Sequence, residues 1–309
     1  MSDRFPRVLR YKSPAVALAR SSHPSSALKG HGFSRAEKPQ KRSWALAPEG
    51  SLKAFLLTLI LFALPGVTAS AQKPAQPATT LRIAAAADLQ PLLPALLAQF
   101  QQQTGIHAEA SYQSSATLAA QIIDGAPFDL FLAADLSFPQ RVIDAGRAEE
   151  AQPIPYARGA LVLWTRNDSG VSTLSLAALR DPAVKTIAIA NPEHAPYGRA
   201  AQAALEHTGF YDSLRSKLVV AENIAQAAQY ADSGNAQAGF ISLTSALTPR
   251  LRASGHFIRV PNEDYPPILQ GAVVIRASAA SSAAHRFLDF LAQPATRQTL
   301  AAEGLEPVR

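Results

Sequence analysis

Two stretches of small residues lie where a strand-like segment is followed by a helix-like segment. Ala84-Ala85-Ala86-Ala87-Asp88-Leu89 follows an apolar start, and Ser114-Ser115-Ala116-Thr117-Leu118 follows a second extended segment. A helix N-terminus presents unpaired N–H groups and a partial positive charge, and small side chains let a ligand approach that backbone closely. Two such starts facing one cleft would hold an anion without any cationic side chain. The pattern predicts a binding site for a small oxyanion.

From residue 81 onward, strand-like and helix-like segments alternate, which predicts an α/β architecture with largely parallel sheets. Residues 129–134 form a continuous apolar run typical of a central parallel strand. Strands are expected over residues 81–86, 106–112, 129–134, 160–165, 186–190, 217–220, 236–242, 256–260 and 271–276. Helices are expected over residues 89–104, 115–124, 138–145, 174–179, 197–208, 223–232, 281–292 and 295–302.

The formal net charge of +6 comes from the N-terminal part of the chain. Residues 1–71 hold 11 of the 29 Lys and Arg and only 3 of the 23 acidic residues, which leaves 18 basic against 20 acidic residues afterwards. The part from Gln72 onward is therefore close to neutral. Without a basic stripe it offers no surface for nucleic acid.

Residues 51–71 have the pattern of a secretory signal: a basic start at Lys53, an apolar stretch, a Pro65-Gly66 break and an Ala-x-Ala end at Ala71. We expect cleavage after Ala71 and a periplasmic protein. The alternative is a membrane anchor, for which the apolar run is short. The polar extension over residues 1–50 is either a long disordered leader or the result of a true start near Leu52. Residues 72–78 form a Pro/Ala/Gln-rich linker.

Signatures of catalysis and of metal binding are missing from the sequence. It has no Cys, which excludes disulfides, thiolate chemistry and a lipid-modified Cys. It has no phosphate-binding glycine loop, no zinc-protease motif and no nucleophile elbow. The histidines after residue 71 have no metal-ligand spacing, so we expect surface or capping roles. No enzymatic activity, cofactor or metal ligand is expected.

From Leu81 to Arg309 the chain resembles the periplasmic molybdate-binding proteins of ABC transporters. Individually the matching stretches are of moderate specificity, but their shared order and spacing make the resemblance strong. Besides the two junctions above, the resemblance rests on Gly125-Ala126-Pro127-Phe128-Asp129-Leu130-Phe131-Leu132-Ala133-Ala134-Asp135, Asn191-Pro192-Glu193-His194-Ala195-Pro196-Tyr197-Gly198 and Ala238-Gly239-Phe240-Ile241-Ser242.

The resemblance implies a two-lobed periplasmic binding protein fold, similar to type II, with the ligand in the cleft between the lobes. Each lobe would hold a mixed, mostly parallel sheet flanked by helices. Residues 79–158 plus 265–309 would form lobe 1, and residues 159–264 lobe 2. Closure would occur at hinges near residues 156–159 and 263–265.

By position, the family's ligand residues fall on Ala87, Ser115, Tyr197, Ile224 and Ser242. Ala87 stands where the family has a serine, and Ser242 where it often has a tyrosine, so two side-chain contacts are changed. The backbone donors fall on Tyr197 and Ile224. No residue would coordinate the metal itself, because molybdate binds through its oxygens. Asp88 places a carboxylate beside the predicted anion site, and we expect it to turn away and cap its own helix.

The resemblance therefore implies capture of molybdate or tungstate by a monomer, which delivers the anion to the permease of an ABC transporter. The main alternative is a binding protein of the same fold for another small anion such as sulfate. An organic acid is a further possibility, although the matching stretches contain no arginine and only Arg199 lies beside one, next to Tyr197-Gly198. An enzyme of the same two-lobed shape that anchors its cofactor through Cys, such as a porphobilinogen deaminase, is disfavoured because Cys is absent. A regulator's sensing domain is disfavoured by the signal segment.

Overall fold

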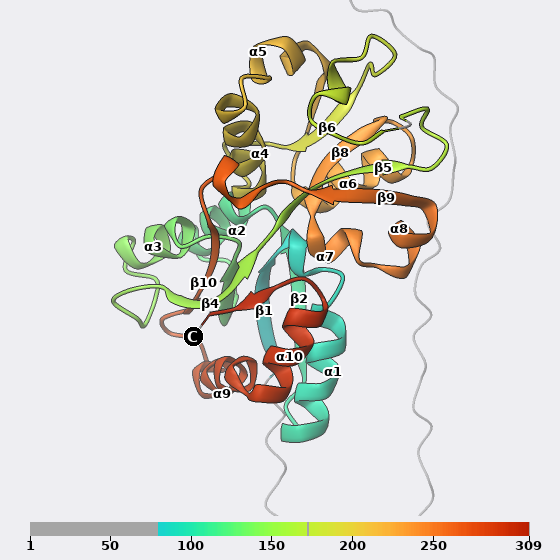
Figure 1. Ribbon diagram of the computed structural model, residues 1–309. Helices are drawn as coiled ribbons and strands as arrows, with labels where there is room; N and C mark the ends of the chain where they lie inside the picture. Colours follow the sequence, from blue (N-terminus) through green and yellow to red (C-terminus); the bar gives the residue numbers. More distant parts are fainter. Residues whose placement is uncertain (1–79, 172, 309) are drawn as a thin grey trace, which may run out of the picture. The chain divides into compact units, whose positions relative to one another are not determined.

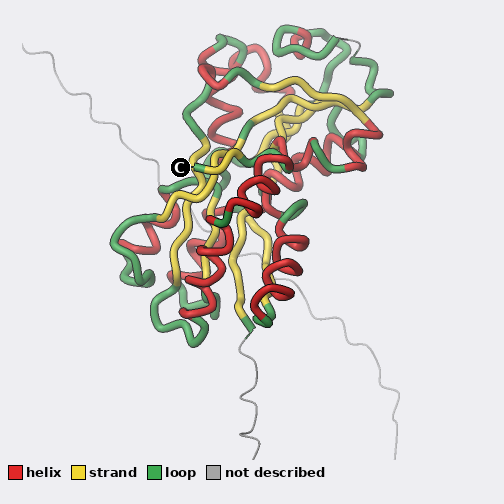
Figure 2. The backbone as a smooth tube through the Cα atoms, turned by 60° about the horizontal axis from the view of Figure 1, so that its bottom comes forward, coloured by secondary structure: helices red, strands yellow, loops and turns green. Residues whose placement is uncertain are grey.

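The computed structural model describes residues 80–171 and 173–308, all within one compact unit of the chain. The leader, signal and linker predictions lie outside the described residues. Two sheets, each covered by helices, make up the described part (Figures 1 and 2). We call the six-stranded sheet with its helices lobe 1 and the five-stranded sheet with its helices lobe 2.

Lobe 1 is built on strands from both ends of the described chain. In spatial order its strands are β11 (Glu306–Pro307), β4 (Ile154–Gly159), β10 (Ile268–Val274), β3 (Leu130–Ala133), β1 (Leu81–Ala86) and β2 (Ala108–Gln113). Its helical segments are the 3-10 turn η1 (Ala87–Leu89) and α1 (Leu93–Thr104), α2 (Ser115–Ile123), α3 (Ser137–Asp144), α9 (Ser281–Ala292) and α10 (Pro294–Ala302).

Lobe 2 comes from the middle of the chain. Its strands lie in the order β7 (Leu218–Ala221), β6 (Ile187–Ala190), β8 (Ala238–Ser242), β5 (Leu161–Arg166) and β9 (Gly255–Arg259). Its helices are α4 (Pro196–His207), α5 (Tyr211–Leu214), α6 (Ile224–Asp232), α7 (Leu243–Ala246) and α8 (Pro249–Ser254), with short 3-10 turns η2 (Ala178–Arg180), η3 (Arg215–Lys217) and η4 (Asn262–Asp264). The two-lobed α/β class predicted above is confirmed.

Both sheets are mixed, as predicted, but parallel pairings are not in the majority. β1 pairs in parallel with β2 and β3, and β6 pairs in parallel with β7 and β8. The remaining pairings are antiparallel, and all of them involve β4, β5, β9 or β10. These are the strands next to the two crossings between sheets: β4 leads into β5, and β9 leads towards β10 (Figure 1). A chain that leaves a sheet along one strand and comes back along its neighbour makes an antiparallel pair. A parallel pair would need a crossover connection, usually a helix.

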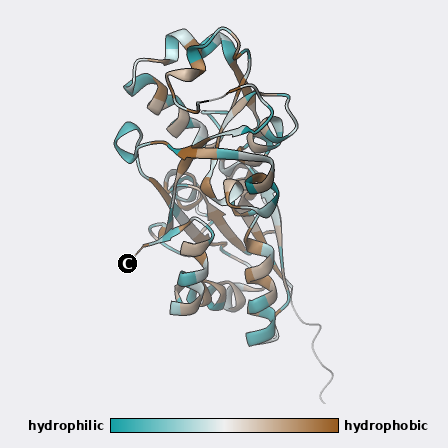
Figure 3. Ribbon diagram, turned by 45° about the vertical axis from the view of Figure 1, so that its right-hand side comes forward, coloured by the Kyte–Doolittle hydropathy of each residue, from teal (hydrophilic) through white to brown (hydrophobic). Residues whose placement is uncertain are grey.

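The cores consist of apolar strand faces packed against helix stripes, and Figure 3 shows the hydrophobic colouring following the strands. In lobe 1 three phenylalanines from α1 and α9 meet, with the Phe100 and Phe287 ring centroids 5.0 Å apart. In lobe 2 the buried indole of Trp164 donates to the Leu251 carbonyl at 3.2 Å. Each lobe thus has a packed interior that fixes the ends of its strands.

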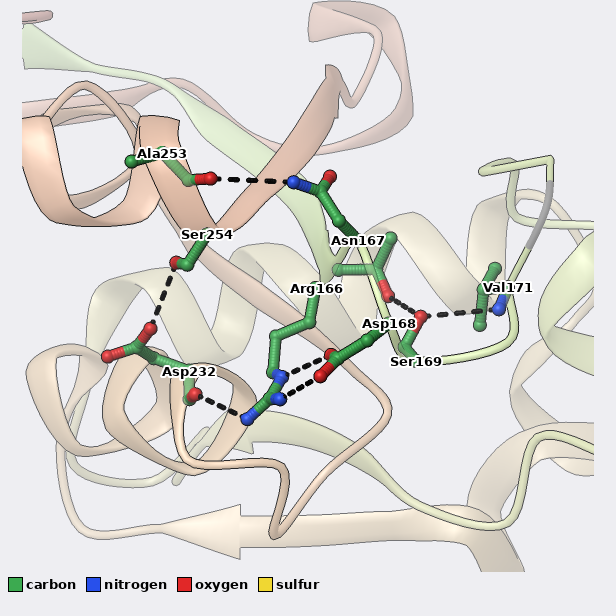
Figure 4. A network of polar contacts seen from close by, with 9 residues as sticks. Arg166, Asn167, Asp168, Ser169, Val171, Asp232, Ala253 and Ser254 are labelled. Carbon is green, nitrogen blue, oxygen red and sulfur yellow. Dashed lines mark hydrogen bonds and ion pairs between the residues drawn. The ribbon is translucent and has the colours of Figure 1, made fainter.

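A polar network supports the end of lobe 2 where β5 leaves the sheet (Figure 4). Arg166 pairs with Asp168 and donates to the Asp232 carbonyl at 3.3 Å. The Asp232 carboxylate accepts from the Ser254 hydroxyl at 3.1 Å and from Arg250 at 2.6 Å. These contacts tie α6 and α8 to β5 at the lobe surface, so we assign them a structural role.

Local differences from the predicted elements have simple causes. α1 begins at Leu93 rather than Leu89, because Pro91 and Pro94 prevent a regular helix from starting earlier. Pro94 lies in the first turn of α1, where proline is tolerated. Residues 174–179 do not form a helix; only the 3-10 turn η2 is present there. The strands β4 and β11 and the short helices α5, α7 and α8 were not predicted, because their stability comes from tertiary contacts rather than from periodicity.

Candidate anion-binding site

The predicted helix starts of both lobes line one small cavity, with a volume of about 10 Å³. Ala87 and Ser115 come from lobe 1, and Tyr197 and Ile224 come from lobe 2. Its other lining residues are Ala86, Asp88, Gln113, Ser114, Ala134, Ala195, Pro196 and Asn223. Four of the five predicted ligand residues therefore lie together. The fifth, Ser242, does not line this cavity.

In lobe 1 the donors follow β1 and precede α2. Ala87 is the first residue of η1, and Ser115 is the first residue of α2, so their N–H groups lack intrahelical acceptors. The cap of α2 is Ser114, whose hydroxyl accepts from the Thr117 N–H at 3.2 Å. The buried Ser115 hydroxyl accepts from the Ala134 N–H at 3.0 Å, which leaves its own proton free to donate.

In lobe 2 no side chain caps the start of α4. Pro196 occupies the first helical position and has no N–H, so Tyr197 supplies the first one. Gly198 is required here because a Cβ at this position would collide with the backbone of Ala190 at the end of β6. The start of α6 adds the Ile224 N–H, while the Asn223 side chain accepts from the Gln226 N–H at 3.0 Å.

The two lobes touch each other around this cavity. The Ala116 N–H of α2 donates to the His194 carbonyl at 3.1 Å. Arg199 of α4 pairs with Asp135, which follows β3. The Thr117 hydroxyl lies 3.5 Å from a Glu222 carboxylate oxygen. Donors from both lobes are thereby held around one point.

Asp88 does not cap its own helix, contrary to the prediction. Its carboxyl is fully buried, and Oδ2 accepts from the Tyr197 hydroxyl at 3.2 Å and from the Gln270 amide. Oδ1 has no hydrogen-bond partner among the described residues. Burial raises the pKa of Asp88 to about 6, against the lowering effect of the bonds from Gln270 and Tyr197. The carboxyl is turned into the contact between the lobes.

Ser242 has a structural role that explains its distance from the cavity. It precedes α7, and its hydroxyl accepts from the Ser245 N–H at 3.3 Å as an N-cap. The neighbouring Thr244 hydroxyl donates to the Asp88 carbonyl at 2.7 Å. The Ser242 hydroxyl therefore caps α7, and the Thr244 hydroxyl holds α7 against η1.

Sequence reasoning missed the side chains behind the cavity. Gln270 is fully buried in β10, and its amide oxygen accepts from the Tyr156 hydroxyl at 2.7 Å. The ring of Tyr197 passes so close to the crossing between β4 and β5 that a Cβ on Gly159 would collide with its hydroxyl. The available signal was a single glutamine within the apolar run of β10, since a buried amide needs polar partners.

The cationic side chain of Arg199 is engaged outside the cavity. Arg199 does not line the cavity; its guanidinium pairs with Asp135 and lies 5.3 Å from the centre of the Phe138 ring. A larger surface hollow of about 630 Å³ beside α4 includes Asp135, Glu193 and Glu206 with the single cation Arg199, a composition unsuited to a multivalent anion. Small size and backbone donors distinguish the cavity between the lobes.

Within residues 80–171 and 173–308 no group of three or more His, Cys, Asp or Glu is placed to hold a metal ion. In that same part of the chain, no helix combines the length and the apolar character that crossing a membrane requires. His194, His207 and His285 each lie beside a carboxylate on the surface.

Two α/β lobes that close over backbone donors define a two-lobed binding protein. The chain belongs to the bacterial extracellular solute-binding proteins, whose family model matches residues 81–306. This family assignment confirms that the protein binds a solute and is not an enzyme, and it indicates a location outside the cytoplasm.

Relatives of known identity agree with this assignment. The chain is 36% identical over 197 residues to the molybdate-binding protein ModA of Rhodobacter capsulatus, covering 64% of this chain and 76% of that protein. It is 33% identical over 252 residues to ModA of Azotobacter vinelandii, covering 81% of this chain and 98% of that protein. The structure of the Azotobacter vinelandii periplasmic molybdate-binding protein superposes with a TM-score of 0.69 and 31% identity, covering 74% of this chain and 100% of that chain.

Proposed function

We propose that the protein binds molybdate in the periplasm and delivers it to an ABC transporter. The observation that carries the proposal is the convergence of Ala87, Ser115, Tyr197 and Ile224 on one cavity between the lobes. The naming of its relatives as molybdate-binding proteins supports the choice of anion. Backbone N–H groups and the Ser115 hydroxyl would donate to the oxygens, and no side chain would coordinate molybdenum.

The backbone N–H groups and the Ser115 hydroxyl at the cavity are hydrogen-bond donors, which favour a fully deprotonated anion. Molybdate and tungstate are dianions at neutral pH and need donors alone. Phosphate keeps a proton, and leaving that proton or a donor unpaired costs about 1–3 kcal/mol. Sulfate has the charge of molybdate but is smaller, so cleft dimensions would have to exclude it. We therefore expect similar affinities for molybdate and tungstate and weaker binding of sulfate.

A conformational cycle follows from the size of the cavity. Its volume of about 10 Å³ corresponds to about one water molecule, so a tetrahedral oxyanion needs the lobes to move apart in order to enter. The crossings near residues 156–159 and 263–265 are the proposed hinges. The closed, loaded form would be what the permease recognises. We expect the protein to act as a monomer and to need no cofactor.

Export is proposed to follow from the signal segment at residues 51–71, with cleavage after Ala71. Intact mass of the protein recovered from the periplasm would give the mature N-terminus. A mass that begins at Gln72, or within a few residues of it, is expected. Retention of residues 1–50 would contradict the proposal.

Titration calorimetry with molybdate, tungstate, sulfate and phosphate tests the function directly. Periplasmic protein should bind molybdate at least tenfold more tightly than sulfate, a difference of about 1.4 kcal/mol. Comparable affinity for sulfate in a competition titration would make the sulfate alternative the better assignment.

A further inference from the structure

Asp88 brings an ionisable carboxyl to a cavity whose proposed donors are neutral. Asp88 lines the cavity and is the residue next to Ala87, whose N–H is a proposed donor. The side chain is fully buried, and its Oδ1 has no hydrogen-bond partner among the described residues. A dianion and an ionised carboxylate side by side in a water-poor site repel each other strongly. One of the two charges has to be removed for tight binding.

The surroundings of Asp88 provide no cation to balance a negative charge. Its two partners are the neutral hydroxyl of Tyr197 on α4 and the neutral amide of Gln270 on β10. Tyr156 of β4 faces the same cluster, and both phenols have pKa values raised by burial first and then by the charge of Asp88. On α7 the Thr244 hydroxyl contacts only the backbone carbonyl of Asp88.

Other titratable side chains lie on the elements packed against η1 and its partners. None of the following forms a hydrogen bond with Asp88 or shifts its pKa: Glu109 and Tyr112 on β2, Arg158 on β4, Arg199 on α4, and Tyr230 and Asp232 on α6. Arg199 and Asp232 are paired with Asp135 and Arg250 respectively. Protonation of Asp88 itself is the remaining way to neutralise the site.

The burial of Asp88 depends on closure of the lobes. Asp88 lies in lobe 1, and the Tyr197 hydroxyl that covers it comes from lobe 2. When the lobes separate, the carboxyl loses this cover and gains access to water, which favours its ionised form. In the closed form burial raises its pKa to about 6 even without a neighbouring anion, and a bound dianion would raise it further.

We propose that Asp88 takes up a proton when the lobes close on the anion, so that capture of a dianionic oxyanion is coupled to protonation of this carboxyl. This inference rests on the proposed function. The proton comes from solvent and is held on Asp88, where its free oxygen Oδ1 is available to carry it. Affinity then falls as pH rises, because fewer carboxyls are protonated at a given anion concentration. Release towards the permease, on opening, would return the proton to water.

The coupling is measured by calorimetry of molybdate binding between pH 6.5 and pH 8.5, where the ligand stays dianionic. Repeating each titration in buffers of different ionisation enthalpy gives the number of protons taken up. Wild-type protein should take up protons at pH 6.5 to 7, and its affinity should weaken at least tenfold across the range, since a fully linked proton changes affinity about tenfold per pH unit. Asp88→Asn should take up none and should show less than a twofold change.

His194 supplies the matched control, because it is another ionisable residue at the contact between the lobes, where its carbonyl accepts from the Ala116 N–H. His194→Gln should keep the wild-type pH dependence and proton uptake. Thermal unfolding verifies that both variants are folded, and Asp88→Glu, which keeps a carboxyl, serves as a second variant that should retain coupling.

The possible outcomes distinguish failure of the proton coupling from failure of the proposed function. Tight molybdate binding that is independent of pH in wild-type protein overturns the coupling and leaves the function intact. Full pH dependence in Asp88→Asn, or its loss in His194→Gln, shows that another group carries the proton. Absence of molybdate binding at every pH overturns the proposed function itself.

Discussion

Two buried aspartates lie at opposite edges of the sheet in lobe 1, one where its parallel strands begin and the other where they end. Asp129 precedes β3, and both of its carboxylate oxygens are used: Oδ2 accepts from the Arg82 N–H at 2.7 Å, and Oδ1 accepts from the Ser278 hydroxyl at 2.7 Å. The Arg82 side chain adds a cation at 3.3 Å. Asp88 follows β1 at the other edge, where it has two neutral donors, one unpartnered oxygen and a pKa raised by burial.

The comparison shows that the two edges of one sheet have different roles. The carboxyl ends of parallel strands are where ligands bind in open α/β sheets, because helix N-termini converge there. At that edge the charge of Asp88 is left unbalanced beside the site. At the opposite edge the charge of Asp129 is fully compensated and holds neighbouring segments together. A buried carboxyl thus stabilises the fold at one edge and responds to the ligand at the other.

The largest effect is expected from Asp129→Ala. It leaves the Arg82 N–H and the Ser278 hydroxyl without their acceptor, at about 1–3 kcal/mol each, so the loss in unfolding free energy should be about 4 kcal/mol. Chemical denaturation measures it. The variant should keep the wild-type pH dependence of anion affinity, and an altered pH dependence would break the division between the two edges.

Asp88→Asn should change stability in a way that depends on pH. A native pKa of about 6 against 3.8 means that the folded state holds more protons between these values, so unfolding free energy falls as pH rises through that window. The shift of about two units corresponds to about 3 kcal/mol of stability lost above the window. The variant lacks this loss. Its stability relative to wild type should therefore be higher at pH 7.5 than at pH 4, as measured by urea denaturation at both.

Ser115→Ala should lower affinity, and it should also lower unfolding free energy by about 1–3 kcal/mol because the buried Ala134 N–H loses its acceptor. The cap of α2 is Ser114, and the Ser115 hydroxyl, which accepts from the Ala134 N–H, keeps its proton to donate to the ligand. Its removal should cost about 1.5–3 kcal/mol of binding, or about 10- to 150-fold in the dissociation constant. Molybdate titration measures the change. An unchanged dissociation constant would mean that the site lies elsewhere.

Ser114→Ala is the matched control and should show the smallest effect. It removes the hydroxyl that accepts from the Thr117 N–H, which should lower unfolding free energy by about 1 kcal/mol. Its effect on affinity should be clearly smaller than that of Ser115→Ala. Equal losses of affinity from both substitutions would contradict the separation of cap from ligand donor.

Local sequence signals determined the alternating elements and the helix starts. The strand-to-helix junctions at Ala87 and Ser115 and the uncapped start after Pro196 depend only on neighbouring residues. The same holds for the helix ends at Gly105 and Gly125, whose φ values of 71° and 94° favour glycine. The order and spacing of the motifs also indicated the family, because both can be read directly from the sequence.

The tertiary structure decided what stands around those starts. Asp88 meets Tyr197 across 109 positions of sequence and Gln270 across 182, and no local pattern encodes such partners. The diversion of Ser242 into the cap of α7 and the antiparallel strands at the crossings have the same origin. Backbone geometry within a helix start is set by short-range sterics and hydrogen bonds, whereas the ionisation of a buried carboxyl is set by which distant groups exclude water from it.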